Sequence, residues 1–458
     1  YWDIIWNNTG PQTTRKKILG TSFEVIIENE NQTEISFKRT WNASQSNEPP
    51  LKIDKRFIML RDTPGFYTYT IVERLEGWPH SYIQNLRIVF KLQQDVFNYM
   101  SVSDERQRFM PTAEDRENGK VLDYKEAVLL TSPTNSNFKG EVDDKYFYAS
   151  DNKDGKVYGW VSNTNPPLGF WMINPSNEYR TGGPLRQDLT THVGPTVLSV
   201  FVSTHYAGED LAIKFQHEET WKKVIGPVFV YLNSDPLAKE NPSILWNDAK
   251  KRMNEEVASW PYEFPVSKDY IKSNQRGTVR GQLLVHDRIL IIYSIFVCRF
   301  RQYGLWKQYS VLYPKNDLVY NVETGNYSSD WFYAHVTRKI GNNTYNATTW
   351  KIIFDLANVD NSSNYTLQLA LAAAHESELQ VRVNDEKAQE PHFTTGYMGG
   401  SNAIARHGIH GLYWYHSIGI QGNLIVEGTN TIFLTQIMAL TPYQGVMYDY
   451  IRFEGPHQ

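Results

Sequence analysis

The 458-residue chain has a single cysteine, Cys298, so no disulfide can form within it. It also lacks a charge excess, because its formal net charge is −4 and its sequence pI is about 6.3. The nearly unbroken apolar run at residues 289–298 is too short for a bilayer, which takes about 20 residues to cross. We read that run as a buried strand or an unnatural junction. We therefore expect a globular monomer with no nucleic-acid or membrane partner.

The motifs of several common enzyme classes are missing as well. The chain has no GxSxG, no P-loop, no GxGxxG after a predicted strand and no HExxH. Serine hydrolase, nucleotide-binding and zinc-protease functions therefore have no support, and we expect no cofactor. His407 and His410 lie three positions apart, but no third ligand follows at a spacing that favours zinc, so we expect no metal either.

Apolar and aromatic side chains, in contrast, are abundant. Hydrophobic residues make up 41% of the chain, with 29 Tyr and 13 Trp, which is enough to build real cores and stacking surfaces. The length fits about three domains.

Eight N-x-S/T sequons occur, where chance would give about two or three, and they favour a secreted glycoprotein over a surface that is merely rich in Asn and Thr. Their asparagines are Asn7, Asn31, Asn42, Asn326, Asn342, Asn346, Asn361 and Asn364. The first residues, YWDIIW, show no signal peptide, so either the true start is missing or the protein stays inside the cell.

Alternating apolar and polar residues predict strands through most of residues 1–225. TSFEVIIENENQTEISFKRTW alternates on both sides of the turn-like ENENQ, and GFYTYTIVERLEGWP, NLRIVFKL and PTVLSVFVSTHY continue the pattern. Short strands separated by Gly, Pro, Asn and Asp indicate a large antiparallel β-sandwich.

A different spacing marks residues 226–300. Apolar residues recur there at intervals of three and four between Pro242 and Pro261, which predicts one amphipathic helix. These residues are Leu245, Trp246, Ala249, Met253, Val257 and Trp260.

Strand patterns return in residues 301–458. YTLQLALA places Tyr365, Leu367, Leu369 and Leu371 on one face, and NLIVEGTNTIFLTQ predicts two strands paired across EGTN. We therefore expect an all-β protein that ends in a second sandwich of jelly-roll type.

Several charged and aromatic clusters are candidates for a binding site. Arg106 and Arg108 fall on one side of a predicted strand, where two cations can clamp a carboxylate. The segments SNEYRTGGPLRQDLTTHVGP and STHYAG add Tyr179, Arg180, Arg186, His192, His205 and Tyr206. Each also has a purely structural explanation, such as solvent-facing arginines or histidines bonded to backbone carbonyls. The same choice applies to Lys145 in EVDDKYFYASDNKDGKVYGW, which is either a solubilising strand-edge charge or a reactive group.

Longer strings resemble a known family. KRFIMLRDTPGFYTYTI, DERQRFMP, EAVLL, GEVDDKYFYASDNKD, GFWMINPSNEYRTGGPLRQDLTTHVGP, RQYGLWKQYSVLYP, HFTTGYMGGSNAIARHGIHGLYW and QGVMYDYIRFEGP resemble the rhamnogalacturonan lyases of polysaccharide lyase family 4, above all the plant members. The resemblance runs along nearly the whole chain. It implies a galactose-mutarotase-like catalytic sandwich over residues 1–225, a fibronectin type III-like domain within 226–300 and a carbohydrate-binding jelly roll over 301–458.

The resemblance also implies a function and a catalytic pair. The family cleaves the galacturonate–rhamnose backbone of rhamnogalacturonan I in pectin by β-elimination. Its catalytic lysine and histidine match Lys145 in DDKYFY and His192 in THVGP. Arg106, Arg108, Tyr179, Arg180, His205 and Tyr206 are our inferred substrate-binding residues, chosen for charge and placement.

β-Elimination needs a base for the C5 proton, a cation beside the carboxylate and a proton for the leaving oxygen on C4. A lysine serves as the base only if its pKa falls from about 10.4 to near neutrality. Arg106 and Arg108 are candidate cations for that effect, and strand alternation would put Asp143 beside Lys145 and Asp144 opposite. We favour Lys145 as base and His192 as donor or stabiliser, with the reverse assignment left open.

The sequence departs from the family pattern in two places. Family members carry further strand sequence before YWDIIW, and a domain-sized segment stands where this chain has only ILIIYSIFVCRF. We therefore expect a truncated chain that lacks most of the middle domain. Three interpretations remain: a secreted lyase, an inactive pectin-binding homologue, or a truncated gene product.

Overall fold

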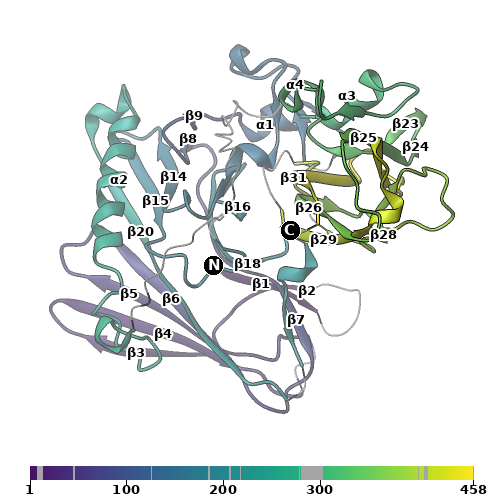
Figure 1. The fold of residues 1–458 in the computed structure, drawn as a ribbon. Helices are drawn as coiled ribbons and strands as arrows, with labels where there is room; N and C mark the ends of the chain where they lie inside the picture. Colours follow the sequence, from purple (N-terminus) through teal and green to yellow (C-terminus); the bar gives the residue numbers. More distant parts are fainter. Residues whose placement is uncertain are drawn as a thin grey trace.

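The computed structural model describes residues 1–456 apart from 8–13, 45–46, 125, 184–185, 206–207, 217, 278, 280–302, 401 and 407–410. Two β-sandwiches lie next to each other, the first built from strands between Trp2 and Ser234 and the second from strands between Val319 and Glu454 (Figure 1). The predicted all-β fold is confirmed. The apolar run at 289–298 and most of the fibronectin-like remnant fall outside the described residues.

The first sandwich consists of two large antiparallel sheets. Among the described residues, the larger sheet has nine strands, in spatial order β3 (Ser22–Glu28), β4 (Gln32–Thr40), β5 (Lys52–Leu60), β6 (Gly65–Arg74), β20 (Trp221–Ser234), β15 (Leu168–Ile173), β14 (Val157–Ser162), β8 (Phe97–Ser101) and β9 (Gln107–Phe109). The other has β17 (Thr191–His192), β18 (Thr196–Ser203), β7 (Ser81–Lys91), β1 (Trp2–Asn7) and β2 (Thr14–Lys17), with β19 (Ile213–Phe215) also paired to β7. The four quoted strand patterns correspond to β3 with β4, β6, β7 and β18.

The core between these sheets explains the alternation in the sequence. Trp2 and Ile4 of β1 point inward, and Trp2 stacks on Phe201 of β18 at a centroid distance of 5.3 Å. Each large apolar side chain buried in this way contributes about 1.5–3 kcal/mol relative to its exposed state. A one-residue slip of any strand would turn these side chains to solvent, so burial sets the register.

The predicted helix is α2 (Ser243–Ala258), which lies along the outer face of the nine-stranded sheet (Figure 1). Leu245, Trp246 and Ala249 are buried against that face. Because β20 crosses residue 225 and α2 packs on the same sheet, the first sandwich extends past the expected boundary at 225.

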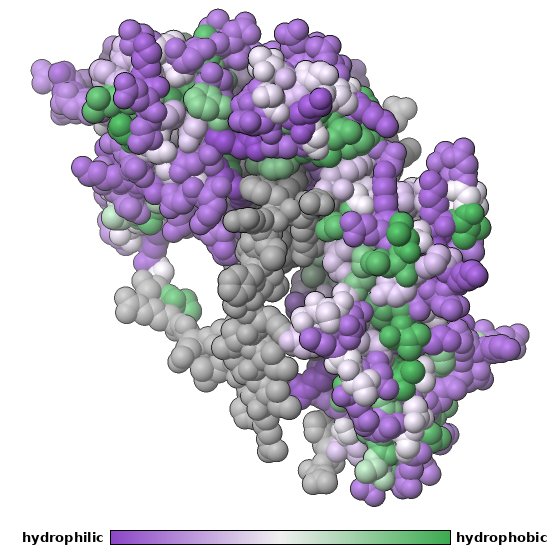
Figure 2. All heavy atoms as spheres, turned by 90° about the horizontal axis from the view of Figure 1, so that it is seen from above, coloured by the Kyte–Doolittle hydropathy of each residue, from purple (hydrophilic) through white to green (hydrophobic). Residues whose placement is uncertain are grey.

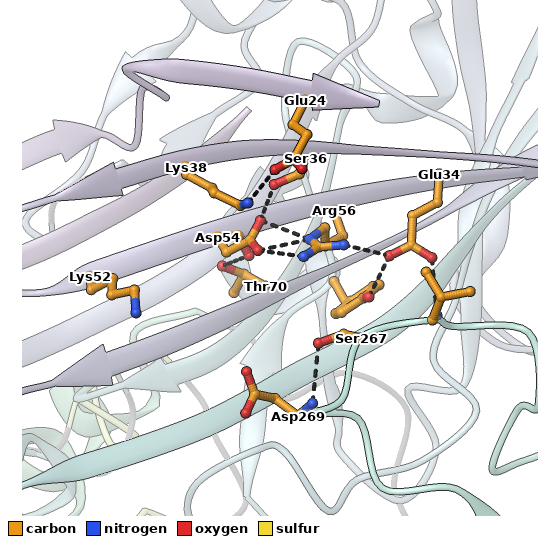
Figure 3. Close-up of polar contacts among 12 residues, drawn as sticks. Glu24, Glu34, Ser36, Lys38, Lys52, Asp54, Arg56, Thr70, Ser267 and Asp269 are labelled. Carbon is orange, nitrogen blue, oxygen red and sulfur yellow. Dashed lines mark hydrogen bonds and ion pairs between the residues drawn. The ribbon is translucent and has the colours of Figure 1, made fainter. Parts of the chain in front are cut away.

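A buried polar network joins the strands of that outer face to the segment after α2 (Figure 3). Arg56 bonds to Asp54 and, at 3.0 Å, to Glu34, whose carboxylate also accepts a bond from the Tyr69 hydroxyl at 2.7 Å. The amide of Val266 donates to the other Glu34 oxygen at 3.2 Å. Glu34 is therefore one point at which the segment after α2 is tied to the sheet, and Gln32, whose side chain donates to the Phe264 carbonyl at 3.0 Å, is another.

The second sandwich has a five-stranded and a four-stranded sheet within the described residues. The first comprises β21 (Val319–Asn321), β25 (Thr348–Leu356), β30 (Gly428–Gln436), β27 (Leu379–Val383) and β28 (Phe393–Thr394), and the second β22 (His335–Val336), β31 (Gly445–Glu454), β26 (Asn364–His375) and β29 (Trp414–Gln421). The face predicted on β26 is confirmed, because Tyr365, Leu367, Leu369 and Leu371 are all buried.

The hairpin predicted across EGTN is wrong. Residues before it form the short 3-10 helix η6 (Gly422–Leu424), and β30 begins only at Gly428 and pairs with β25 and β27. The side chain of Asn430 bonds to both the amide and the carbonyl of Val426, which holds this segment in a turn instead of a strand.

The remaining helices and strands are short. They are α1 (Ala113–Glu117), α3 (Leu305–Leu312), α4 (Tyr327–Asp330), β10 (Lys120–Val121), β11 (Val128–Leu129), β12 (Val142–Asp143), β13 (Ala149–Asp151), β16 (Gln187–Leu189), β23 (Arg338–Gly341), β24 (Thr344–Asn346) and the 3-10 helices η1 (Ser136–Phe138), η2 (Lys145–Tyr148), η3 (Glu209–Leu211), η4 (Pro236–Lys239) and η5 (Ser273–Gln275).

The face in Figure 2 is mostly hydrophilic, with hydrophobic residues in small groups, in keeping with the mean hydropathy of −0.50. Within the described ranges no helix is both long and apolar enough to cross a membrane.

Candidate active site

Pairing between two short strands brings Lys145 and His192 together. β13 pairs antiparallel with β16 in a register that sets Ala149 opposite Leu189, and the Thr190 amide continues the ladder to the carbonyl of Tyr148 at 3.0 Å. Before Ala149 the chain forms the 3-10 helix η2 (Lys145–Tyr148), so the ladder ends there and brings η2 beside β17. The helix η2, which begins at Lys145, accordingly contacts β17, which ends at His192.

Lys145 is not on a strand, which corrects the alternation argument. β12 ends at Asp143 and η2 starts two residues later, so successive side chains no longer alternate between two faces. Asp144, which we expected to point away, is buried on the same side as the site and accepts a bond from the Lys145 amide.

The ammonium of Lys145 forms an ion pair with Glu126, which lies between β10 and β11. Burial disfavours the Glu126 carboxylate, but its bond to Lys145 and the charges of Lys145 and Arg406 outweigh that effect and lower its pKa below the ordinary value. In the absence of a substrate, Lys145 is therefore a cation held against an anion.

His192 is the neutral member of the pair. Burial, together with the nearby charge of Lys145, lowers the pKa of its imidazole to about 4. Nδ1 lies 3.3 Å from the Val193 carbonyl, and the ring stacks on Tyr148 at a centroid distance of 6.0 Å. At neutral pH the ring has a lone pair free to take a proton.

Asp143 binds the tyrosine on which the His192 ring stacks. Burial raises its pKa, an effect opposed by the Arg116 guanidinium that pairs with it. The Tyr148 hydroxyl donates to both Asp143 oxygens, at 3.0 and 3.1 Å. Tyr148 is thereby fixed beneath the imidazole of His192.

Asp144 faces a cation from the second sandwich. Arg406 Nη1 lies 3.3 Å from Asp144 Oδ1, and Arg406 Nη2 lies 3.3 Å from Glu126 Oε2. Burial raises the pKa of Asp144 to about 6, against the opposing charge of Arg406. One partly buried cluster of charges thus contains the carboxylates of Glu126, Asp143 and Asp144 and the cations Lys145, Arg116 and Arg406.

Arg106 and Arg108 bind different partners within the chain, so their predicted role as a clamp on a substrate carboxylate stays a prediction. Arg106 donates to the carbonyl of Ala149 at 2.6 Å, so it braces the chain just after η2. Arg108 pairs instead with Glu141 at 2.8 Å and lies over the ring of Phe138. The cations that share carboxylates with Lys145 or its neighbours are Arg116 and Arg406.

Tyr179 and Arg180 make contacts within the first sandwich. Tyr179 is 1% exposed and packs edge-on against Phe201 and Trp260, which is the environment of a core side chain, so its role in substrate binding stays a prediction. Arg180 bonds to Asn152 at 3.1 Å and Ser199 at 3.2 Å, contacts that hold the chain before β16 onto β18.

Two of the remaining candidates lie within the described residues. His205 is half-buried in the turn after β18, where its amide donates to the Ser203 hydroxyl. Tyr206, His407 and His410 lie outside the described residues. Arg186 pairs with the buried Asp188 at 2.9 Å. No group of three potential metal ligands occurs in the part of the chain that the structure describes.

Sequence reasoning did not place Glu126, Arg116 or Arg406 at the catalytic pair. Two signals were available, since Glu126 lies in EAVLL and Arg406 in SNAIARHGIHGLYW, both strings that carried the family resemblance. Neither string shows by itself that the two residues meet.

Two family profiles match the chain. The profile of the rhamnogalacturonate lyase family matches residues 1–142, and that of polysaccharide lyase family 4, domain III, matches residues 256–453. Lys145 and His192 lie between the two matched ranges, and Arg406 lies within the second.

Curated relatives are similar at low identity. A rhamnogalacturonate lyase of Dickeya dadantii is 26% identical over 57% of this chain and 40% of its own length. A probable rhamnogalacturonate lyase B of Aspergillus niger is 24% identical over 50% of this chain and 33% of its own length. The matched regions thus span less than half of these relatives.

Fold and site define a two-sandwich, all-β protein with a lysine–histidine pair at the β17 edge of the first sandwich. With the two family profiles, they identify the chain as a member of the rhamnogalacturonate lyase family, polysaccharide lyase family 4.

Proposed function

We propose that this protein cleaves rhamnogalacturonan I, the galacturonate–rhamnose polymer of pectin, as an endolyase acting by β-elimination. The observation that carries the proposal is the meeting of Lys145 and His192 around Glu126 in a chain of this family. The base removes the proton on C5 of a galacturonate. The C5–H electrons form the C4–C5 double bond, and the C4–O bond breaks toward rhamnose, whose oxygen takes up a proton. No oxidant or reductant is required.

The roles of base and of its catalytic partner can be assigned to Lys145 and His192 in two ways. In the first, Lys145 is the base and His192 assists the leaving oxygen. In the second, neutral His192 accepts the C5 proton and the Lys145 ammonium stabilises the carboxylate as negative charge develops.

The charge states of the substrate-free site favour the second assignment. The first requires the Lys145–Glu126 pair to open, so that Lys145 can lose its proton. A galacturonate carboxylate that binds at this point competes with Glu126 for the ammonium, and it also raises the pKa of His192 by its negative charge.

The direct test is incubation of the purified chain with rhamnogalacturonan I, followed by ultraviolet absorbance of the conjugated, unsaturated uronate. A parallel incubation with unbranched homogalacturonan serves as the substrate control. Absence of the chromophore, with the polymer retained in a pull-down, would instead support a pectin-binding protein without catalysis.

We also propose that the protein is secreted to the cell wall. Of the eight sequon asparagines, seven are exposed and Asn7 is half-buried, as glycan attachment requires. Expression in a secreting eukaryotic host followed by glycosidase treatment should lower the apparent mass, and an unchanged mass would oppose secretion.

A further inference from the structure

Near Lys145, each sandwich inserts a side chain into the other. Tyr124, from the segment between β10 and β11, is buried in the core of the second sandwich, where its ring meets Tyr443 edge-on at 5.0 Å. In the opposite direction, Arg406 of the second sandwich reaches the first and is 0% exposed.

Arg406 joins three residues of the first sandwich. Its guanidinium carbon lies 4.9 Å from the centre of the Tyr124 ring, and its two terminal nitrogens reach Glu126 and Asp144, each at 3.3 Å. A forked, permanently charged group can hold two carboxylates at once, which an ammonium does less well. Glu126 is the ion-pair partner of Lys145, and Asp144 precedes Lys145 in the sequence.

The segment that carries Glu126 has little support of its own. The strands beside it, β10 and β11, are two residues long, and Glu126 has φ +71°, a conformation that costs a non-glycine residue about 1–2 kcal/mol. Contacts from outside the segment must therefore maintain it. Such contacts come from Tyr443, which packs on Tyr124, from Arg406 at the carboxylate, and from Arg116, which donates to the Glu126 carbonyl at 2.7 Å.

We propose that Arg406 is a positioning residue of the elimination site and that the second sandwich, through Arg406 and through its packing around Tyr124, holds Glu126 against Lys145. The site is then composite, built from both sandwiches, and the second sandwich contributes more than sugar binding. This inference rests on the proposed lyase function for its kinetic consequence but not for its effect on stability.

The charges around Arg406 determine how its loss should depend on pH. The charged or titratable groups that face Arg406, Glu126 or Asp144 are Asp143, Lys145, His192, Tyr124, Tyr303 and Arg116, whose guanidinium donates to the Glu126 carbonyl. Arg406 opposes the effect of burial on Asp144, so its removal raises the pKa of Asp144 above its present value of about 6, and it raises that of Glu126 as well. Both carboxylates then destabilise the fold more strongly at pH 8, where they are forced to ionise, than at pH 5.

The experiment compares Arg406→Gln and Arg406→Lys with the control Arg382→Gln in the full chain. Arg382 lies in the same sandwich, and its guanidinium bonds to the Ala388 carbonyl and the Gln380 side chain there. Two readouts are measured for each variant: kcat and KM on rhamnogalacturonan I, and Tm between pH 5 and pH 8.

For Arg406→Gln we expect kcat to fall about 100-fold with KM within about threefold, since misplacement of a reacting group mainly affects the transition state. Its Tm should fall further below that of Arg382→Gln at pH 8 than at pH 5. Arg406→Lys keeps the charge and should recover part of both losses. If Arg406→Gln does not fold, Arg406→Lys carries the test, with an expected kcat loss of about tenfold.

Unchanged kcat in the folded variants, or a Tm difference that does not depend on pH, would overturn the inference. If the unmodified chain yields no unsaturated product, the proposed function fails on its own, whereas the Tm comparison still decides whether Arg406 holds the two carboxylates.

Discussion

Lys145 and Glu126 form an ion pair in which the carboxylate is the outer partner, with 42% of its side chain exposed against 13% for the lysine. Solvent therefore reaches Lys145 mainly past Glu126. A uronate that approaches Lys145 meets a carboxylate already in place, and the two must compete for one ammonium.

Replacement of Lys145 tests its role. Lys145→Ala should lower kcat by about 10²–10⁴-fold, the usual contribution of a proton-transfer group, while polymer retention in a pull-down stays nearly unchanged. Lys153→Ala removes an exposed lysine that pairs with Asp154 and should leave both measurements as they are. Equal loss of cleavage and binding would mean that Lys145 only holds the sugar acid.

Lys145→Arg distinguishes the two assignments of the pair, because arginine keeps the charge and cannot act as a base at neutral pH. Activity clearly above that of Lys145→Ala would assign Lys145 the cationic role and His192 the base. Activity as low as that of Lys145→Ala would make Lys145 the base. The measurement is the initial rate of unsaturated uronate formation.

The His192 imidazole should titrate far below an ordinary histidine. Burial and the charge of Lys145 lower its pKa to about 4, so the neutral ring stabilises the fold above about pH 6.5, and this contribution is lost as the pH falls toward 4. Lys145→Met should move the midpoint upward because it removes the ammonium. NMR of the imidazole protons checks this, with His192→Gln to assign the signal, and a midpoint near 6.5 in the unmodified chain would contradict it.

The outer-face network around Glu34 should matter for stability. Glu34→Ala leaves Arg56 without one of its carboxylates and should lower the free energy of unfolding by about 3 kcal/mol. Lys38→Ala breaks the exposed Lys38–Glu24 pair in the same sheet and should cost less than about 1 kcal/mol. Urea denaturation of both variants gives the comparison, and equal costs would show that the buried pair is not important for the fold.

Tyr179 should behave as a core residue. Tyr179→Ala removes a ring packed between Phe201 and Trp260 and should cost about 3 kcal/mol of stability. At temperatures where the variant is folded, KM should not change. Tyr397→Ala, at a side chain that is 62% exposed, is the control for stability. A raised KM without loss of stability would restore Tyr179 to the binding site.

Local patterns in the sequence determined the class of fold. Alternation indicated β3, β4, β6, β7, β18 and β26, and the spacing between Pro242 and Pro261 indicated α2. The alternation located these strands but not their burial, because β18 is buried along its whole length and β3 is largely exposed. The motifs around Lys145 and His192 marked the candidate pair, which the register of β13 with β16 then brought together.

Only the tertiary structure decided which charges surround that pair. Glu126, Arg116 and Arg406 reach Lys145 and its neighbours through loop placement and through docking of the second sandwich, and Arg406 lies 262 positions from Asp144. The alternation rule failed at Asp144 because β12 ends one residue earlier, and Tyr179 became a core residue because Phe201 and Trp260 enclose it. Periodicity reports the face that one element buries, whereas the partner of a buried charge depends on contacts between elements far apart in the chain.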